Sequence, residues 1–314
     1  MSTADTTTRS DLTSTTDPSH GAVVVGLDAD GSASAALDWA VEDAVRRHRP
    51  LHLVCAAEPV YPDVMAGAIV MDSADDSSTE VLDAAVARVH ELAPGHAVHG
   101  TAERLRALDV LVHASRTADV LVVGTHGHGR LGTLVLGSTS LQVVSQATCP
   151  VVVVRHSAPV PSPESRPRVV VGVDGSAVSM AAVDFAFAQA DARGIGLTVI
   201  HGWNPDAVKG VDVRTPSGNR FREAGQLEVA ATAESIAGHA ALYPDVDVRT
   251  HVIRKSPTDA LVAEADGAEL LVVGSRGWGD VRGLLLGSVS QGVLRRVPCP
   301  VAVVRPRLVP AQDA

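Results

Sequence analysis

Short apolar runs alternate with longer amphipathic stretches along the first half of the chain. The apolar runs are rich in valine and do not alternate with polar residues, which is typical of parallel strands buried on both faces. They lie at Ala22–Leu27, Leu51–Ala56, Val120–Gly124 and Val151–Val154. Helical periodicity with Ser, Thr or Asp near the starts as caps predicts helices at Ser32–Arg47, Ser78–Leu92, Thr101–Arg116 and Ser138–Gln146.

A weaker fifth strand is predicted around His96–His99 and has a counterpart at Asp245–Ile253 in the second half. Strands that alternate with helices favour right-handed βαβ units. The predicted fold class is therefore α/β, with two tandem, doubly wound, five-stranded parallel sheets in a Rossmann-like arrangement.

The chain is an internal duplication. The segment Val23–Ala40 returns 146 residues later as Val169–Ala186, and Val120–Ser140 returns 150 residues later as Leu270–Ser290. A fixed offset of this kind indicates two copies of one structural unit. Every candidate residue in one half therefore has an equivalent in the other.

A proline-rich segment separates the two copies. Residues 156–167 contain four prolines, which disfavour a helix and stiffen the chain. We predict a disordered tail at 1–20, a first domain at 21–155, a linker at 156–167, a second domain at 168–306 and a short tail at 307–314.

Composition narrows the class of protein. Of the 314 residues, 46% are hydrophobic and 20% are charged, as in globular proteins. The net charge of −10, with 26 basic residues that do not cluster, disfavours nucleic acid as a partner. No run approaches 18 apolar residues, and residues 1–20 lack the apolar core of a secretory signal. Three isolated cysteines fit a reducing compartment. We expect a cytoplasmic protein that does not enter membranes.

Candidate chemistry lies in the loops that follow the predicted strands, where open α/β sheets bind ligands. After the fourth strand of each half, two glycines, a third glycine and a serine recur with the same spacing. These residues are Gly124, Gly127, Gly137 and Ser138, and then Gly274, Gly277, Gly287 and Ser288. Glycines allow close backbone approach, and a Gly-Ser pair at a helix start favours anions. The alternative is tight turns and a helix cap, but the repetition favours a polyphosphate cradle.

Other nucleotide and hydrolase motifs do not fit. A phosphate-binding loop of the GxxxxGK[ST] type needs a lysine, and the only lysines, Lys209 and Lys255, do not follow such a loop. The string Gly127–Gly132 matches GxGxxG, but the second half does not repeat it. No GxSxG turn occurs, so an α/β-hydrolase triad lacks its serine.

At these loops and at the segment VGVDGS, the chain resembles the universal stress protein family over Gly21–Arg155 and Arg168–Arg305. The resemblance implies a five-stranded α/β fold that binds ATP in each half. The implied first site comprises Asp28, Ala56, Val123, Gly124, Gly127, Gly137, Ser138, Thr139 and Ser140. The implied second site comprises Asp174, Gly202, Val273, Gly274, Gly277, Gly287, Ser288, Val289 and Ser290. Adenine would lie against Ala56 or Gly202.

The resemblance places Asp28 and Asp174 beside the nucleotide, where Mg²⁺ would reconcile a carboxylate with phosphates. The alternative role for each is a helix cap or a turn. The first site departs from the family pattern, because Ala29 stands where the second half has a glycine and Ala107 where it has Pro257. We expect a looser first site.

Two histidines on the first glycine loop, His126 and His128, form an HxH pair. Because no third ligand is in view, a polar loop is favoured over a metal site. His201, at the end of a predicted strand, is expected to be a hydrogen-bonded core histidine.

The predicted function is an ATP-binding regulator of the stress or dormancy response, with slow catalysis or none. One alternative is a slow Mg²⁺-dependent ATPase or nucleotide-transferring enzyme that uses Asp28 or Asp174 with His126. Another is a nucleotide-free scaffold for protein partners. The apolar strands Val151–Val154 and Val301–Val304 would be exposed edges if unpaired. In the family such strands pair, which implies an internal pseudo-dimer or a homodimer.

Overall fold

The computed structural model describes most of both halves. The described residues are 17–28, 34–56, 73–125, 136–155, 167–203, 230, 232–277 and 286–306, with side chains described from 78 onward in the helix that begins at Ser73. Residues 1–16 of the predicted N-terminal tail, residues 156–166 of the predicted linker, the tail at 307–314, His126, Gly127 and His128 lie outside the described residues. Residues 17–20, which were also assigned to the disordered tail, instead form a turn in which Ser19 is buried and its hydroxyl lies 2.9 Å from His52 Nδ1.

Each half alternates strands and helices, as the hydrophobic pattern predicts. The first half comprises β1 (Val23–Leu27), α1 (Ser34–Arg46), β2 (Leu51–Ala56), α2 (Ser73–Leu92), β3 (Val98–Glu103), α3 (Ala107–Ala114), β4 (Val120–Gly124), α4 (Ser138–Gln146) and β5 (Val151–Val154). The second comprises β6 (Arg168–Gly172), α5 (Ala177–Arg193), β7 (Gly196–Gly202), helical residues 232–242, β8 (Val248–Ile253), α7 (Pro257–Glu264), β9 (Leu270–Gly274), α8 (Ser288–Arg296) and β10 (Val301–Val304).

One predicted helix, Thr101–Arg116, is wrong at its start. Residues Thr101 to Glu103 belong to β3 and pair in parallel with the end of β2, and the helix begins only at Ala107. β3 is an edge strand with partly exposed, polar side chains, so it lacks the apolar run that identifies the central strands. Pairing with β2 decides its conformation.

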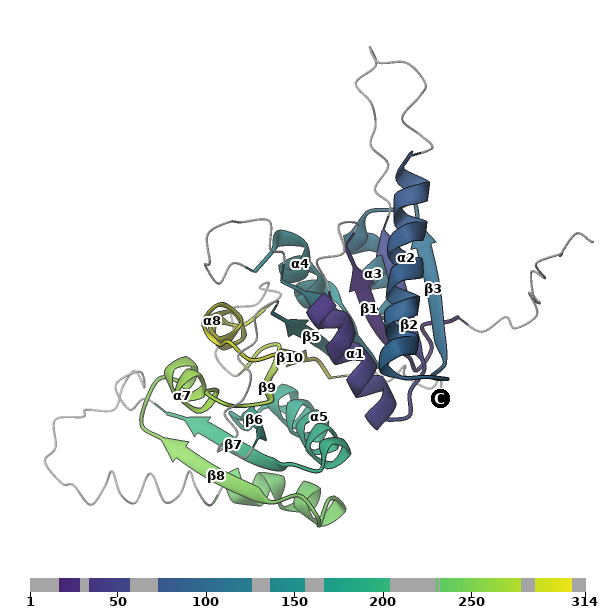
Figure 1. The fold of residues 1–314 in the computed structure, drawn as a ribbon. Coiled ribbons are helices and arrows are strands. Elements are labelled where there is room, and N and C mark those ends of the chain that lie inside the picture. Colours follow the sequence, from purple (N-terminus) through teal and green to yellow (C-terminus); the bar gives the residue numbers. More distant parts are fainter. Residues whose placement is uncertain are drawn as a thin grey trace, which may run out of the picture.

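The strands form one continuous sheet across both halves (Figure 1). Its ten strands have the order β3-β2-β1-β4-β5-β10-β9-β6-β7-β8. Among the strands that the structure describes, pairing is parallel within each half and antiparallel between β5 and β10, with Val152 opposite Ala302. The five parallel strands predicted for each half are present. The apolar last strand of each half pairs with that of the other, which joins the two sets into one sheet and removes two edges prone to aggregation.

Helices cover both faces of the sheet and create two hydrophobic cores. On one face, α1, α2, α5 and residues 232–242 bury residues such as Val89 and Phe187. On the other face, α3, α4, α7 and α8 bury residues such as Leu111 and Leu294. Both cores run through the two halves without a break, so the halves share their hydrophobic interior.

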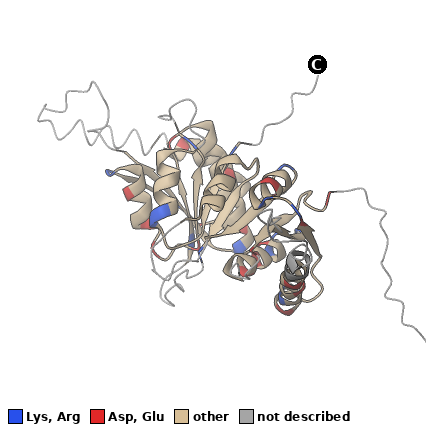
Figure 2. Cartoon of the chain, turned by 90° about the horizontal axis from the view of Figure 1, so that it is seen from above, with Lys and Arg blue, Asp and Glu red and all other residues tan. Residues whose placement is uncertain are grey.

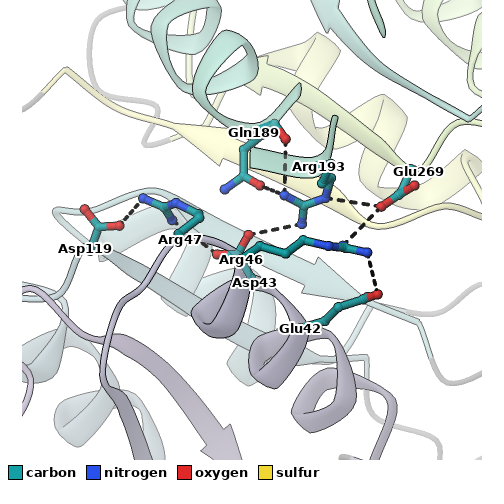
Figure 3. Close-up of polar contacts among 8 residues, drawn as sticks. All are labelled: Glu42, Asp43, Arg46, Arg47, Asp119, Gln189, Arg193 and Glu269. Atoms are coloured by element: carbon teal, nitrogen blue, oxygen red, sulfur yellow. Dashed lines mark hydrogen bonds and ion pairs between the residues drawn. The ribbon is translucent and has the colours of Figure 1, made fainter. Parts of the chain in front are cut away.

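A polar network joins α1 and α5 on the first face (Figure 3). The fully buried carboxylate of Asp43 accepts from Arg47 Nη1 at 3.2 Å and from Arg193 Nη2, in the other half, at 3.1 Å. The Arg193 guanidinium also lies 3.3 Å from Glu269 Oε1 and 5.2 Å from the Trp39 ring centroid. Removing one partner of a buried ion pair leaves the other charge buried and uncompensated, which is costly. The network therefore favours the arrangement in which the two halves keep these contacts.

Candidate functional site

Both candidate sites lie where the winding direction of the sheet reverses. In the first half the chain winds from β1 outward to β2 and β3, and then crosses to β4 on the other side of β1. In the second half the same reversal falls between β6 and β9. The carboxyl ends of these central strands leave a crevice because the connections diverge.

The second half holds a cavity of about 550 Å³ at this position. It lies among the ends of β6, β7 and β9 and the starts of α7 and α8. The lining includes all nine residues predicted for the second site, namely Asp174, Gly202, Val273, Gly274, Gly277, Gly287, Ser288, Val289 and Ser290. The structure therefore brings together residues that are spread over more than 100 positions of the sequence.

Asp174 forms the turn between β6 and α5. Its Oδ1 accepts from the backbone N–H of Ser176 at 2.9 Å, and Gly175 between them has a φ of 79°. Ser176 in turn caps α5 by accepting from Ser179 N at 3.1 Å. The turn role expected as an alternative for this aspartate is thus present. Because the carboxylate also lines the cavity, Asp174 can both hold this turn and face a ligand.

Gly277 lies tightly against Asp174 on the other side of the cavity. A Cβ at position 277 would come within 2.2 Å of the second carboxylate oxygen, Oδ2. A side chain at position 277 would therefore have to displace the Asp174 carboxylate, whose other oxygen accepts from Ser176 N. The glycine requirement here comes from the proximity of backbone and carboxylate.

The start of α8 faces the same cavity. Gly287 occupies the N-cap position, and its N–H donates to Ser275 O at 2.8 Å. The buried Ser290 hydroxyl donates to the carbonyl of Gly274 at 2.8 Å and so ties the first turn of α8 to the end of β9. N–H groups of a first helical turn have no partner within the helix, and they carry partial positive charge. This end of α8 favours an anion.

The opposite wall of the cavity is the contact between β7 and α7. A Cβ on Gly202 would lie 2.7 Å from Pro257 Cα and 3.2 Å from Ala260 Cβ, so the strand end requires glycine. Ser256 caps α7 by accepting from Asp259 N at 3.2 Å, and Pro257 occupies its first turn.

Some lining residues were not identified from the sequence. Ile200, Ser256, Thr258 and Leu261 complete the wall formed by β7 and α7. A Ser-Pro-Thr-Asp capping pattern precedes α7 and would have predicted the helix start there. The distance from that helix start to the glycine loop is set only by the fold.

The described part of the first site has the same layout. Asp28 follows β1, Ala56 ends β2, and Val123 and Gly124 end β4. Gly137 is the N-cap of α4, whose first turn contains Ser138, Thr139 and Ser140. The Ser140 hydroxyl donates to Gly124 O at 2.8 Å, as Ser290 does to Gly274 in the second half. Gly127 and residues 29–33 lie outside the described residues.

The other singled-out side chains have structural partners. His201 Nδ1 lies 2.9 Å from the carbonyl of Val173, so the expected hydrogen bond is present, but the residue is half-buried at the strand end and does not belong to a core. Cys55, Cys149 and Cys299 are buried and form no disulfide with one another, and burial raises the pKa of the Cys299 thiol to about 11. Within the described ranges, no three His, Cys, Asp or Glu side chains gather in a way that suits a metal ion.

Charges and helix lengths add two observations. Basic and acidic residues are interspersed over the helices in the view of Figure 2. Among the residues that the structure describes, no helix combines the length and apolar character needed to cross a membrane.

Comparison with known proteins shows the family. The chain matches the universal stress protein family over residues 20–155 and 166–305. A universal stress protein of Mycolicibacterium smegmatis is 36% identical over 91% of this chain and 97% of its own length. A crystal structure of a universal stress protein from Archaeoglobus fulgidus has the same fold, with a TM-score of 0.61 at 20% identity over 90% of this chain and 98% of the other.

A universal stress protein solved in complex with cAMP is 33% identical over 45% of this chain and 99% of its own, with a TM-score of 0.34. The matches to the family model and to the mycobacterial protein together span both halves of the duplication. The chain belongs to the universal stress protein family and contains two tandem domains of it.

Proposed function

We propose that the protein binds ATP at the second cradle and, by the equivalent positions, at the first, and that it acts as a nucleotide-dependent regulator of the stress or dormancy response. The carrying observation is the cavity of about 550 Å³, which is lined by Asp174, two close-approach glycines and the start of α8. Its volume is in the range of small-molecule sites.

The cavity offers a distinct environment to each part of a nucleotide. The glycine loop and the α8 N-terminus suit the phosphates, because backbone N–H groups and the helix dipole favour anions. The wall of Ile200, Gly202 and Leu261 is apolar and suits a base. Mg²⁺ would be held by the Asp174 carboxylate together with phosphate oxygens, since hard cations prefer oxygen ligands.

Binding of the nucleotide without rapid hydrolysis is favoured over catalytic turnover. Phosphoryl transfer needs an aligned nucleophile and strong charge stabilisation. Among the described residues that line the cavity, Arg276 is the one basic side chain. The proposal therefore assigns regulation, with slow hydrolysis at most.

Mass identification and counting of the nucleotide that co-purifies with the protein tests this proposal. We expect ATP, approaching two per chain, with one lost in Gly137→Leu and one in Gly287→Leu. The matched control is Gly238→Leu, because a Cβ at this exposed glycine meets nothing within 4 Å. ADP in place of ATP would favour the enzyme. The absence of any nucleotide, with none bound on adding ATP or cAMP with Mg²⁺, would favour the protein-binding scaffold.

A further inference from the structure

Building on the proposed function, we propose that the two nucleotide sites are coupled through two arginines that the halves exchange. Arg155 follows β5 of the first half, and Arg305 follows β10 of the second. Each reaches into the other half and binds the C-terminal end of the helix whose N-terminal end forms a cradle. Filling one site would then raise the affinity of the other.

Arg155 is fastened to α8, the cradle helix of the second site. It is 7% exposed, and its Nε donates to Val297 O at 2.7 Å while Nη2 donates to Leu294 O. These carbonyls lie at the C-terminal end of α8, where the helix dipole is negative and free acceptors remain. Burial lowers the pKa of Arg155. The helix-end carbonyls of α8 are the acceptors that hold its buried guanidinium in place.

Arg305 makes the reciprocal contact with α4, the cradle helix of the first site. Its Nη2 donates to Val144 O at 3.1 Å and to Ser145 O, at the C-terminal end of that helix. Burial lowers the pKa of Arg305, and the positive charge of Arg276 lowers it further. Arg276 also lines the second cavity.

Backbone bonds connect each arginine to the glycine loop of its own half. Val154, directly before Arg155, accepts from Thr125 N at 3.0 Å, and Val304, directly before Arg305, accepts from Ser275 N at 2.8 Å. Thr125 and Ser275 follow the glycines that end β4 and β9.

Two serine bonds complete a closed ring. Ser140 Oγ donates to Gly124 O in the first half, and Ser290 Oγ donates to Gly274 O in the second, each at 2.8 Å. The ring therefore passes from the first loop through Arg155 and α8 to the second loop, and returns through Arg305 and α4. Both cradles are members of one hydrogen-bonded circuit.

The ring implies positive coupling. A phosphate at the N-terminus of α8 and a guanidinium at its C-terminus stabilise the same helix dipole. The first nucleotide would order α8 and, through Arg155, the end of β5, where the Val154 carbonyl accepts from Thr125 N of the first loop. A second nucleotide would then lose less conformational entropy on binding. Couplings between sites are commonly 5- to 150-fold, and we expect about tenfold here.

Calorimetric titration of the nucleotide-free full-length protein with ATP and Mg²⁺ tests this coupling. The affinity of the first site is measured alone in a protein whose second site is blocked by Gly277→Val, and again in an independent block, Gly202→Val. It is compared with the weaker step of the unblocked protein. We expect about tenfold tighter binding in the unblocked protein. The double variant Arg155→Met/Arg305→Met should still bind two nucleotides. In that background, the ratio of the affinities with the second site open and with it blocked should fall to one.

The matched control is Arg296→Met. Arg296 also lies at the end of α8, but its half-exposed side chain pairs with Asp259 at 2.7 Å outside the ring, so the coupling ratio should remain. If the double variant does not fold, Arg155→Lys, which keeps the positive charge on a single nitrogen and loses the two-nitrogen geometry, should show an intermediate ratio. Two equal, independent steps in the unblocked protein would overturn the coupling while nucleotide binding stands. One nucleotide per chain would also overturn it, and no binding at all would overturn both proposals.

Discussion

The second half has small and capping residues around its cradle at positions where the first half has other residues. Gly202, Ser256 and Thr258 correspond to Ala56, Arg106 and Leu108. In the second half Ser256 caps α7, whereas α3 begins after Arg106 without a side-chain cap bond. The wall between the second strand and the following helix therefore differs between the two copies.

The turn after the first strand differs in the same direction. Gly175 has a φ of 79°, a conformation that costs other residues strain, and Ala29 stands at the equivalent position. By contrast, the serines that tie α4 and α8 to the strand ends make identical bonds. The difference teaches that the two copies share the serine contact between the cradle helix and the strand end, while the turn after the first strand and the wall at the end of the second strand differ.

The largest expected effect is the loss of the second site in Gly277→Val. The added side chain would displace the loop from Asp174, because a Cβ alone would come within 2.2 Å of the carboxylate. We expect roughly 100-fold weaker binding there, about 3 kcal/mol, since overpacking a tight contact costs up to about that much. Titration with ATP and Mg²⁺ measures it.

Gly127→Val, the equivalent change in the first half, should remove the other nucleotide. Gly238→Val, at an exposed glycine with open space around it, should remove neither. Two nucleotides still bound at unchanged affinity in Gly277→Val would mean that the cavity is not the second site.

A second large difference between the halves concerns stability at acid pH. It arises near the amino-terminal end of the second strand, away from the cradles. Buried His52 in β2 has its pKa lowered to about 4, first by burial and then by the charge of nearby His99, with Asp17 acting in the opposite direction. The equivalent position in β7 is Thr198, which does not titrate. Below pH 6.5 the unfolded chain takes up a proton that the folded protein does not bind, so stability falls as the pH falls toward 4.

Urea unfolding between pH 7 and pH 4 measures this contribution. The wild-type protein should lose at most about 3 kcal/mol from His52 over that range, and the loss should shrink in His52→Thr, which copies the second half. The comparison rests on the slope with pH, because removing the 2.9 Å contact with Ser19 also shifts the baseline. Equal slopes for the two proteins would contradict the assignment.

Exchanging the residue at the end of the second strand should make the two base walls more alike. Gly202→Ala places a Cβ 2.7 Å from the backbone of Pro257, so we expect about 1–3 kcal/mol lower stability and several-fold weaker binding at the second site. The reciprocal change, Ala56→Gly, should tighten the first site. Thermal unfolding and titration of both variants check this pair. Unchanged binding in both variants would mean that the residue at the end of the second strand does not affect nucleotide affinity in either half.

The smallest expected effect is on the caps of the two equivalent helices. Arg106→Ser should give α3 the side-chain cap that Ser256 gives α7 and raise the free energy of unfolding by about 1 kcal/mol. Ser256→Ala should lower it by a similar amount. Denaturant unfolding measures both, and opposite signs are required. A loss of stability in Arg106→Ser would show that Arg106 has another role.

The sequence by itself determined the duplication, the central strands and the positions of the cradles. Valine-rich runs identify β1, β4 and β5 because strands buried on both faces lack polar alternation. The glycine spacing identified the second cavity because the turn after a buried strand and the start of the next helix are local features. The edge strand β3 was partly assigned to a helix, since its exposed residues carry no such pattern.

The tertiary structure alone decided how the two copies meet. The joining of β5 to β10, the Asp43 network and the reach of Arg155 to α8 connect residues about 140 or more positions apart. The requirement for glycine at 202 likewise depends on Pro257 across the cavity. Hydrophobic periodicity reports whether a residue is buried, but not which distant residue it meets. Those contacts depend on how the two sets of strands join and on which helix covers each face of the sheet.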